Sequence, residues 1–175
     1  MLKSRPDRYG TMAASIHWIS AIAVILMLTS GLILDGAEDP EQVRTLLRVH
    51  VPLGICVGLL TLLRIVWWLA FDKHPDAPRD LSTTQQWAAR LVHLGLYGAI
   101  IIMVASGIAM VVLTGAMPQI FSGGALPEFS EAPPSFVHGL MGRLLLVLAA
   151  GHILAALYHQ LVRRDNLIGR MRVGG

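Results

Sequence analysis

The stretch SFVHGLMGRLLLVLAAGHILAALYHQLV, residues 135–162, decides the fold of this 175-residue chain. It carries three histidines and a single charged residue, Arg143. As a helix it can cross the hydrocarbon layer of a membrane, which takes about 20 apolar residues. Three similar stretches precede it, so we predict transmembrane helices near residues 14–34, 49–71, 88–114 and 135–162. We therefore expect an all-α integral membrane protein, with residues 1–175 forming a single transmembrane four-helix bundle.

The composition agrees with a membrane protein and excludes several other classes. Hydrophobic residues make up 54% of the chain and charged residues 14%, against roughly 25% charged in soluble domains. A disordered tail, an ordinary soluble enzyme and a nucleic-acid binder are therefore excluded, although the isoelectric point is near 9.5. Cys56 is the only cysteine, which excludes a disulfide framework, a cysteine-rich zinc site, an iron–sulfur cluster and covalent haem attachment.

The basic residues predict the orientation in the membrane. Residues 35–48 and 115–134, on one side of the predicted spans, contain only Arg44 and Arg48. Ten basic residues lie on the other side: Lys3, Arg5, Arg8, Lys73, Arg79, Arg90, Arg163, Arg164, Arg170 and Arg172. Because positive residues remain in the cytoplasm, we expect both termini to be cytoplasmic. Residues 1–38 fit a cleaved signal peptide poorly, because their charge-free stretch is too long and three further spans follow.

The histidines carry the functional signal. Six of the seven lie in or at the ends of the apolar stretches: His17, His50, His93, His138, His152 and His159. One such histidine would be read as an interhelical hydrogen bond, but six indicate metal or haem ligands. His138 and His152 are fourteen residues apart, which places them within about 40° of one helix face and about 21 Å apart along it. That arrangement suits two haems stacked at two depths.

The expected depth of each histidine in the membrane indicates some of the histidine pairs. His50 and His138 both lie at the expected periplasmic ends of their helices, and His17 lies at a cytoplasmic end. The partner of His17 is His152 or His159, with His93 as a further candidate. Depth alone leaves this choice open.

Other residues near these histidines allow two readings each. Arg64 is fourteen residues past His50, where it can pair with a haem propionate or extend to the membrane surface. Gly54 and Gly58 give clearance for a porphyrin or form a helix-packing contact. Arg143 is a weaker propionate candidate, since it points about 140° away from His138.

Taken together, these motifs resemble the bacterial di-haem cytochrome b-561 family over essentially the whole chain. The matching elements are S-I-H-W at Ser15–Trp18, V-H at Val49–His50 followed by Arg64, H-L-G-L-Y at His93–Tyr97, H-G-L at His138, G-H at Gly151–His152, His159, and R-D-N-L at Arg164–Leu167.

The resemblance implies two haem b groups in a bacterial inner membrane. It places one haem between His17 and His152 on the cytoplasmic side, and the other between His50 and His138 on the periplasmic side. It also implies a superoxide oxidase activity, in which electrons pass from periplasmic superoxide to ubiquinone in the surrounding lipid membrane. We assign no catalytic residue, and we expect a quinone near His159 or His93.

Lys73 and His74 are weaker proton-donor candidates, since a solvated loop explains them equally well. The expected periplasmic segments carry six acidic and two basic residues, a net charge of −4. This charge opposes capture of an anion, unless Arg44 and Arg48 form a local positive patch. The alternatives are an electron-carrier subunit that links a periplasmic dehydrogenase or hydrogenase to quinone, and a non-redox membrane protein.

Overall fold

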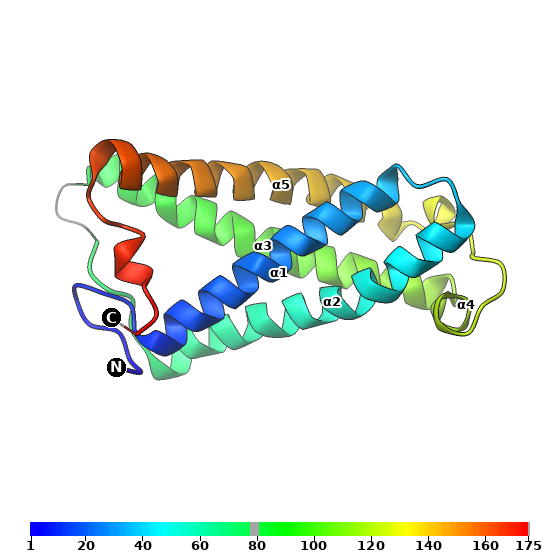
Figure 1. Ribbon diagram of the computed structural model, residues 1–175, viewed down its shortest axis with the longest axis horizontal. Helices are drawn as coiled ribbons and strands as arrows, with labels where there is room; N and C mark the ends of the chain where they lie inside the picture. Colours follow the sequence, from blue (N-terminus) through cyan, green and yellow to red (C-terminus); the bar gives the residue numbers. More distant parts are fainter. Residues whose placement is uncertain (78–80, 175) are drawn as a thin grey trace.

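The computed structural model describes residues 1–77 and 81–174 as an elongated helical bundle (Figure 1). The four long helices are α1 (Thr11–Asp35), α2 (Pro40–Val66), α3 (Thr83–Leu113) and α5 (Pro134–Tyr158). Shorter elements are η1 (Trp67–Phe71), α4 (Met117–Phe121), η2 (Phe129–Glu131), η3 (His159–Arg163) and η4 (Gly169–Met171). The described part of the chain contains no strand, and the predicted all-α four-helix fold is confirmed.

All four long helices can cross a membrane by length and composition. Their outward faces are apolar: Leu59 is 61% exposed, Val112 69% and Leu154 65%. Helices satisfy their own backbone hydrogen bonds, so an apolar exterior of this kind is stable in lipid. The protein is therefore a multi-pass membrane protein.

Two helices begin earlier than the apolar pattern predicts. α2 begins at Pro40 rather than near residue 49, because the Asp39 side chain accepts hydrogen bonds from the backbone of Glu41 and Gln42. α3 begins at Thr83 rather than near residue 88, behind a capping box formed by Ser82 and Gln85. The apolar stretch marks the part of a helix that lies in lipid, whereas the capping residues mark where the helix begins.

Close helix packing explains the glycines of α2. A Cβ atom on Gly58 would lie 2.9 Å from Cγ1 of Val104 on α3, and one on Gly54 would lie 3.2 Å from Cε of Met27 on α1. These two positions therefore let neighbouring helices approach closely. This supports the helix-packing contact, rather than clearance for a porphyrin, as their role.

Both chain termini lie at one end of the bundle, where α1 and α3 begin and α2 and α5 end (Figure 1). Arg170 joins three segments there, by donating to the backbone oxygens of Pro6, Asp7 and Asp76. Nine of the ten basic residues predicted to be cytoplasmic lie at this end. The tenth, Arg79, lies outside the described residues.

Candidate functional site

The bundle brings four of the predicted histidines together as two pairs. His17 of α1 faces His152 of α5 with the ring centres 6.4 Å apart and the planes at 72°. His50 of α2 faces His138 of α5 with the ring centres also 6.4 Å apart and the planes at 66°. α5 thus contributes one histidine to each pair, as the spacing of fourteen residues predicts.

This separation fits an iron atom between each pair of rings. Metal–imidazole bonds of about 2.0–2.1 Å, plus roughly 1.1 Å from each nitrogen to its ring centre, put two axial rings about 6.3 Å apart. Two imidazoles are the two axial ligands of a haem. Among the described residues, no group of three or more His, Cys, Asp or Glu side chains is arranged to hold a bare metal ion.

Serine hydroxyls hold both rings of the His50–His138 pair. Ser30 Oγ lies 2.8 Å from His50 Nδ1 and donates its proton to the Met27 carbonyl. Ser106 Oγ lies 3.1 Å from His138 Nδ1 and donates its proton to carbonyls of its own helix. His138 Nδ1 also lies 3.1 Å from the Met103 carbonyl oxygen. The Met103 carbonyl can only accept, so His138 donates from Nδ1 and Nε2 keeps its lone pair. Each hydroxyl has one proton, so His50 takes the same tautomer when Ser30 donates to the Met27 carbonyl.

Glycines leave space beside the same two rings. A Cβ atom on Gly107 would lie 3.1 Å from Cε1 of His138, and one on Gly31 would lie 3.7 Å from Cε1 of His50. These glycines, with Ser30 and Ser106, were missed at the sequence level. The only signal for them is small residues on the helices that face the histidines, and many helix-packing positions share that signal.

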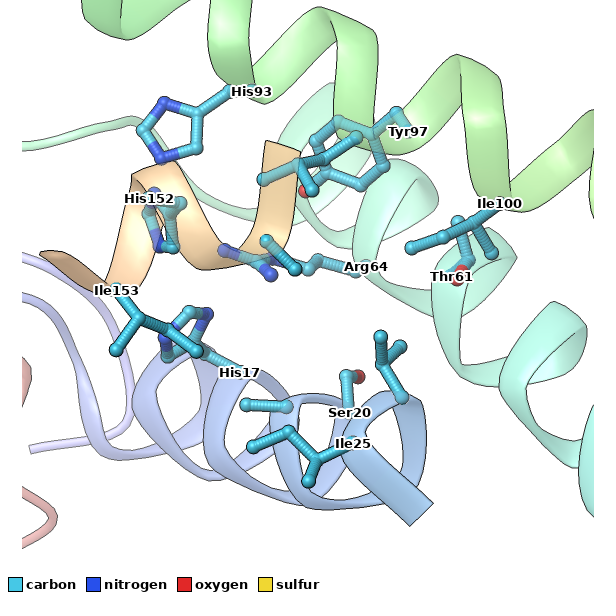
Figure 2. A pocket seen from close by; sticks show the side chains of 14 residues that line it. His17, Ser20, Ile25, Thr61, Arg64, His93, Tyr97, Ile100, His152 and Ile153 are labelled. Carbon is cyan, nitrogen blue, oxygen red and sulfur yellow. The ribbon is translucent and has the colours of Figure 1, made fainter. Parts of the chain in front are cut away.

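A cavity of about 110 Å³ adjoins the His17–His152 pair (Figure 2). Arg64 reaches into it from α2, with its guanidinium 5.5 Å from the ring centre of Tyr97. Arg64 Nε is buried and has no hydrogen-bond partner among the described residues. No acidic residue lines the cavity. A buried cation without a carboxylate suits an anionic ligand.

His93 lies against this pair rather than forming a second one. Its ring centre is 5.1 Å from that of His152, which is shorter than the roughly 6.3 Å that an intervening metal ion requires. His93 is exposed on α3 and lines the cavity, so it lies where the cavity meets the outside of the bundle.

His159 lies apart from the two pairs. Its Nδ1 bonds to the carboxylate of Asp165, which Arg163 also approaches at 3.8 Å. Tyr158 packs edge-on against its ring. Three histidines were candidates for the partner of His17. The structure brings His152 opposite it, whereas His159 lies at the start of η3, beside Asp165. Arg143 is exposed on α5.

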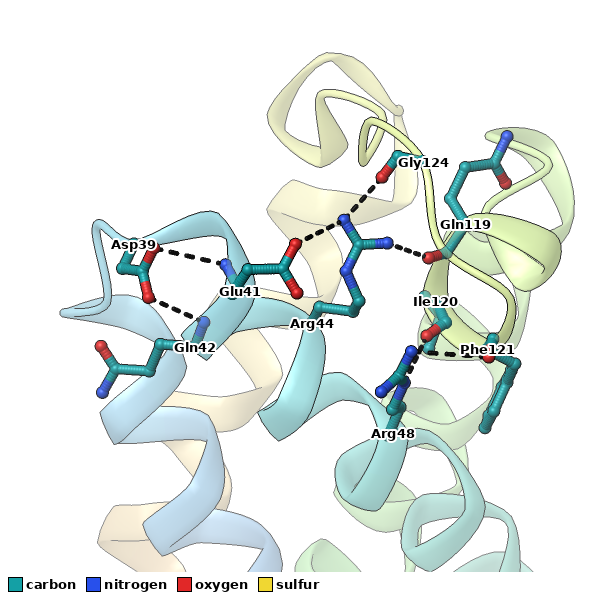
Figure 3. A network of polar contacts seen from close by, with 9 residues as sticks. All are labelled: Asp39, Glu41, Gln42, Arg44, Arg48, Gln119, Ile120, Phe121 and Gly124. Carbon is teal, nitrogen blue, oxygen red and sulfur yellow. Dashed lines mark hydrogen bonds and ion pairs between the residues drawn. The ribbon is translucent and has the colours of Figure 1, made fainter.

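The two arginines at the other end of the bundle both donate to backbone carbonyls, Arg44 from a buried position and Arg48 from an exposed one (Figure 3). Arg44 donates to the carbonyls of Gln119 and Gly124 at 2.5 and 2.6 Å, and its side chain is 7% exposed. Arg48 donates to the Ile120 carbonyl at 2.8 Å. Both guanidinium groups thus hold the α4 segment, whose Ile120 is fully buried.

The loop after η1 carries the weaker proton-donor candidates. Burial acts to raise the pKa of Asp72, but hydrogen bonds from Ser4, Lys73 and Trp67 outweigh it and hold the pKa below its usual value. Burial and the nearby Arg64 lower the pKa of His74, which stacks on Trp68 with the ring centres 3.8 Å apart. Lys73 is exposed, and we find no contact between it and either histidine pair.

Residues 8–174 match the family model described as prokaryotic cytochrome b561. The chain is 27% identical to cytochrome b561 homolog 2 of Escherichia coli (strain K12), covering 95% of this chain and 92% of the relative. It is 26% identical to a Yersinia pestis protein named probable superoxide oxidase CybB, covering 94% and 95%. The cytochrome b561 homolog 1 of Escherichia coli (strain K12) is 23% identical, covering 94% and 97%.

The apolar four-helix bundle, its facing histidine pairs and a match along nearly the whole chain agree with one another. This protein belongs to the prokaryotic cytochrome b561 family, whose members bind haem b and transfer electrons in the membrane.

Proposed function

We propose that this protein is a di-haem superoxide oxidase of the bacterial inner membrane, which passes electrons from periplasmic superoxide to ubiquinone. The observation that carries the proposal is the presence of two histidine pairs with the same 6.4 Å ring separation. In this proposal His17 and His152 hold one haem, and His50 and His138 hold the other.

When bound by two histidines, haem supplies reversible one-electron transfer without an open coordination position. Ser30 and Ser106 orient His50 and His138 so that Nε2 of each ring is the ligand. Arg64, whose Nε has no hydrogen-bond partner in the described part of the chain, would neutralise a propionate at the His17–His152 site.

We propose that both termini are cytoplasmic, because the basic residues gather at the end of the bundle where the termini lie. The His50–His138 pair is then nearer the periplasm. Two superoxide anions give up one electron each there and become dioxygen. One quinone takes up both electrons and two protons at the opposite side.

The exposed edge of the His17–His152 cavity supports a quinone position beside His93. The hydrogen bond between His159 and Asp165 supports His159 as a proton donor. A carboxylate that accepts from Nδ1 holds the imidazole in one orientation, so that the doubly protonated ring would present Nε2–H to the quinone.

A second candidate is an electron-carrier subunit that receives electrons from a periplasmic redox protein. One observation favours it. Arg44 is buried against backbone carbonyls, which leaves Arg48 as the exposed arginine among six exposed acidic residues of the same end. A net negative surface slows the capture of superoxide and attracts a positively charged protein. The similarity to a protein named probable superoxide oxidase favours the first candidate.

Spectroscopy and rapid kinetics test the proposal in order. A reduced-minus-oxidised spectrum of the purified protein, with an iron assay, is expected to show b-type haem at two irons per chain. His50→Ala and His138→Ala should each remove one haem and spare the other. Loss of both haems from folded protein, or of neither, would contradict the assignment of ligands.

The substrate is tested by stopped-flow mixing with a superoxide pulse. We expect the haems to become reduced and then to be reoxidised by added ubiquinone. If superoxide leaves them oxidised while a positively charged redox protein reduces them, the electron-carrier function replaces the superoxide oxidase.

A further inference from the structure

The two histidine pairs share one ring spacing but differ in the hydrogen-bond partners of their Nδ1 atoms. In the His50–His138 pair, each Nδ1 lies within hydrogen-bond distance of a serine hydroxyl, 2.8 Å from Ser30 Oγ and 3.1 Å from Ser106 Oγ. In the His17–His152 pair, His17 Nδ1 is buried and has no hydrogen-bond partner among the described residues.

The two pairs also differ in the charge of the residues around them. Arg64 lines the cavity of the His17–His152 pair, and no acidic side chain lines that cavity to balance it. The residues that contact the rings of His50 and His138 through hydrogen bonds are neutral: Ser30, Ser106 and the Met103 carbonyl.

Each difference acts on a bound iron in a known way. A hydrogen bond from Nδ1–H makes the opposite nitrogen a more basic ligand, and a more basic ligand stabilises the more positive, ferric iron. A nearby buried cation disfavours the ferric iron, which carries the greater positive charge, and by pairing with a propionate it also cancels a negative charge that would stabilise that iron. The first effect lowers the reduction potential of one site, and the second raises that of the other.

We propose that Ser30 and Ser106 are positioning residues that give the His50–His138 site the lower reduction potential, while Arg64 gives the His17–His152 site the higher one. With both sites loaded, an electron would pass downhill along α5 from the His50–His138 site to the His17–His152 site, oxidising the first iron and reducing the second with no proton required. This inference rests on the proposed function, because it requires both haems.

Potentiometric titration of the purified, haem-loaded protein tests the inference without an activity assay. Ser30→Ala and Ser106→Ala should each raise the lower of the two potentials. We expect about a threefold to tenfold change in the reduction equilibrium, or roughly 30–59 mV for one electron. Arg64→Gln should lower the higher potential by a similar amount and leave the other unchanged.

Two further variants separate tuning from general disturbance of the fold. Thr29→Ala removes a neighbouring hydroxyl that donates to the Ile25 carbonyl of its own helix, so both potentials should stay at their wild-type values. Ser106→Thr keeps the hydroxyl and should restore a wild-type potential. His50→Ala identifies which potential belongs to which site, because it removes the haem of the His50–His138 pair.

Several outcomes would overturn the inference. The His50–His138 site could prove to have the higher potential, the serine variants could leave both potentials unchanged, or Thr29→Ala could shift them as much as Ser30→Ala. Any of these with two haems present refutes the inference alone. A wild-type protein without two b-type haems refutes the proposed function as well.

Discussion

Replacing Arg44 by alanine is expected to release the α4 segment from the end of the bundle. The Arg44 side chain is 7% exposed and donates to the carbonyls of Gln119 and Gly124. A hydrogen bond from a charged group contributes about 1.5–3 kcal/mol, so the two together stabilise the attachment of α4 by about 3–6 kcal/mol. The ion pair with Glu41 adds little, because the Glu41 side chain is 75% exposed.

Hydrogen exchange measured by mass spectrometry detects the release of α4, because it reports the exchange rates of the α4 amides. In the Arg44→Ala protein, the amides of α4 and the residues that follow it should exchange faster by a factor of about 100 or more, since every 1.4 kcal/mol is tenfold. Amides in the middle of α3 and α5 should keep their wild-type rates, because neither hydrogen bond reaches them.

Two matched variants sharpen the result. Glu41→Gln removes the ion pair alone and should change exchange of α4 by less than fivefold. Arg44→Lys keeps the charge but not the planar fork that reaches two carbonyls, so its exchange rates should fall between those of wild type and Arg44→Ala. Wild-type protection of α4 in Arg44→Ala, accompanied by slower reduction by superoxide, would refute the structural role and restore Arg44 as an anion-capturing residue.

Three further predictions concern the rest of the chain. Gly58→Ala should lower stability by about 1–2 kcal/mol, because the new Cβ would lie 2.9 Å from Val104 Cγ1. Gly151→Ala, with open space around its Cβ, should be neutral or slightly stabilising in the same thermal unfolding assay. Asp72→Asn should lower the Tm at pH 7, and the difference from wild type should disappear as the pH falls through the depressed Asp72 pKa, where the wild-type carboxylate becomes protonated. His159→Gln should slow reoxidation of the haems by ubiquinone while the haem content stays at two per chain; unchanged reoxidation would remove His159 from the quinone site.

Much of the fold can be read from periodicity and composition alone. The charge-free stretches predict the four spans because a helix in lipid needs a continuous apolar exterior. The boundaries are less certain from that pattern, since Asp39 and the Ser82–Gln85 capping box extend α2 and α3 beyond the apolar residues. Capping depends on single polar side chains, which a hydropathy profile averages away.

The candidate site likewise has features that the sequence predicts and features that it does not. His138 and His152 could be placed on one face at two depths because helix geometry alone relates them. The hydrogen bonds of Ser30 and Ser106 could not be foreseen. Serine is common in apolar helices, and its partner histidine lies 20 or 32 residues away in the chain.

By itself, the sequence determined the class of the protein, the number of spans and the presence of histidines at two depths. These properties depend on local composition and on the regular rise of a helix. Histidine spacing left open which residue faces His17, and only the family resemblance pointed to His152. The tertiary structure brings His152 opposite His17, packs Gly54 and Gly58 against neighbouring helices, and places Arg44 and Arg48 on backbone carbonyls. Those outcomes depend on how the helices rotate and cross, because they join residues that are far apart in the chain.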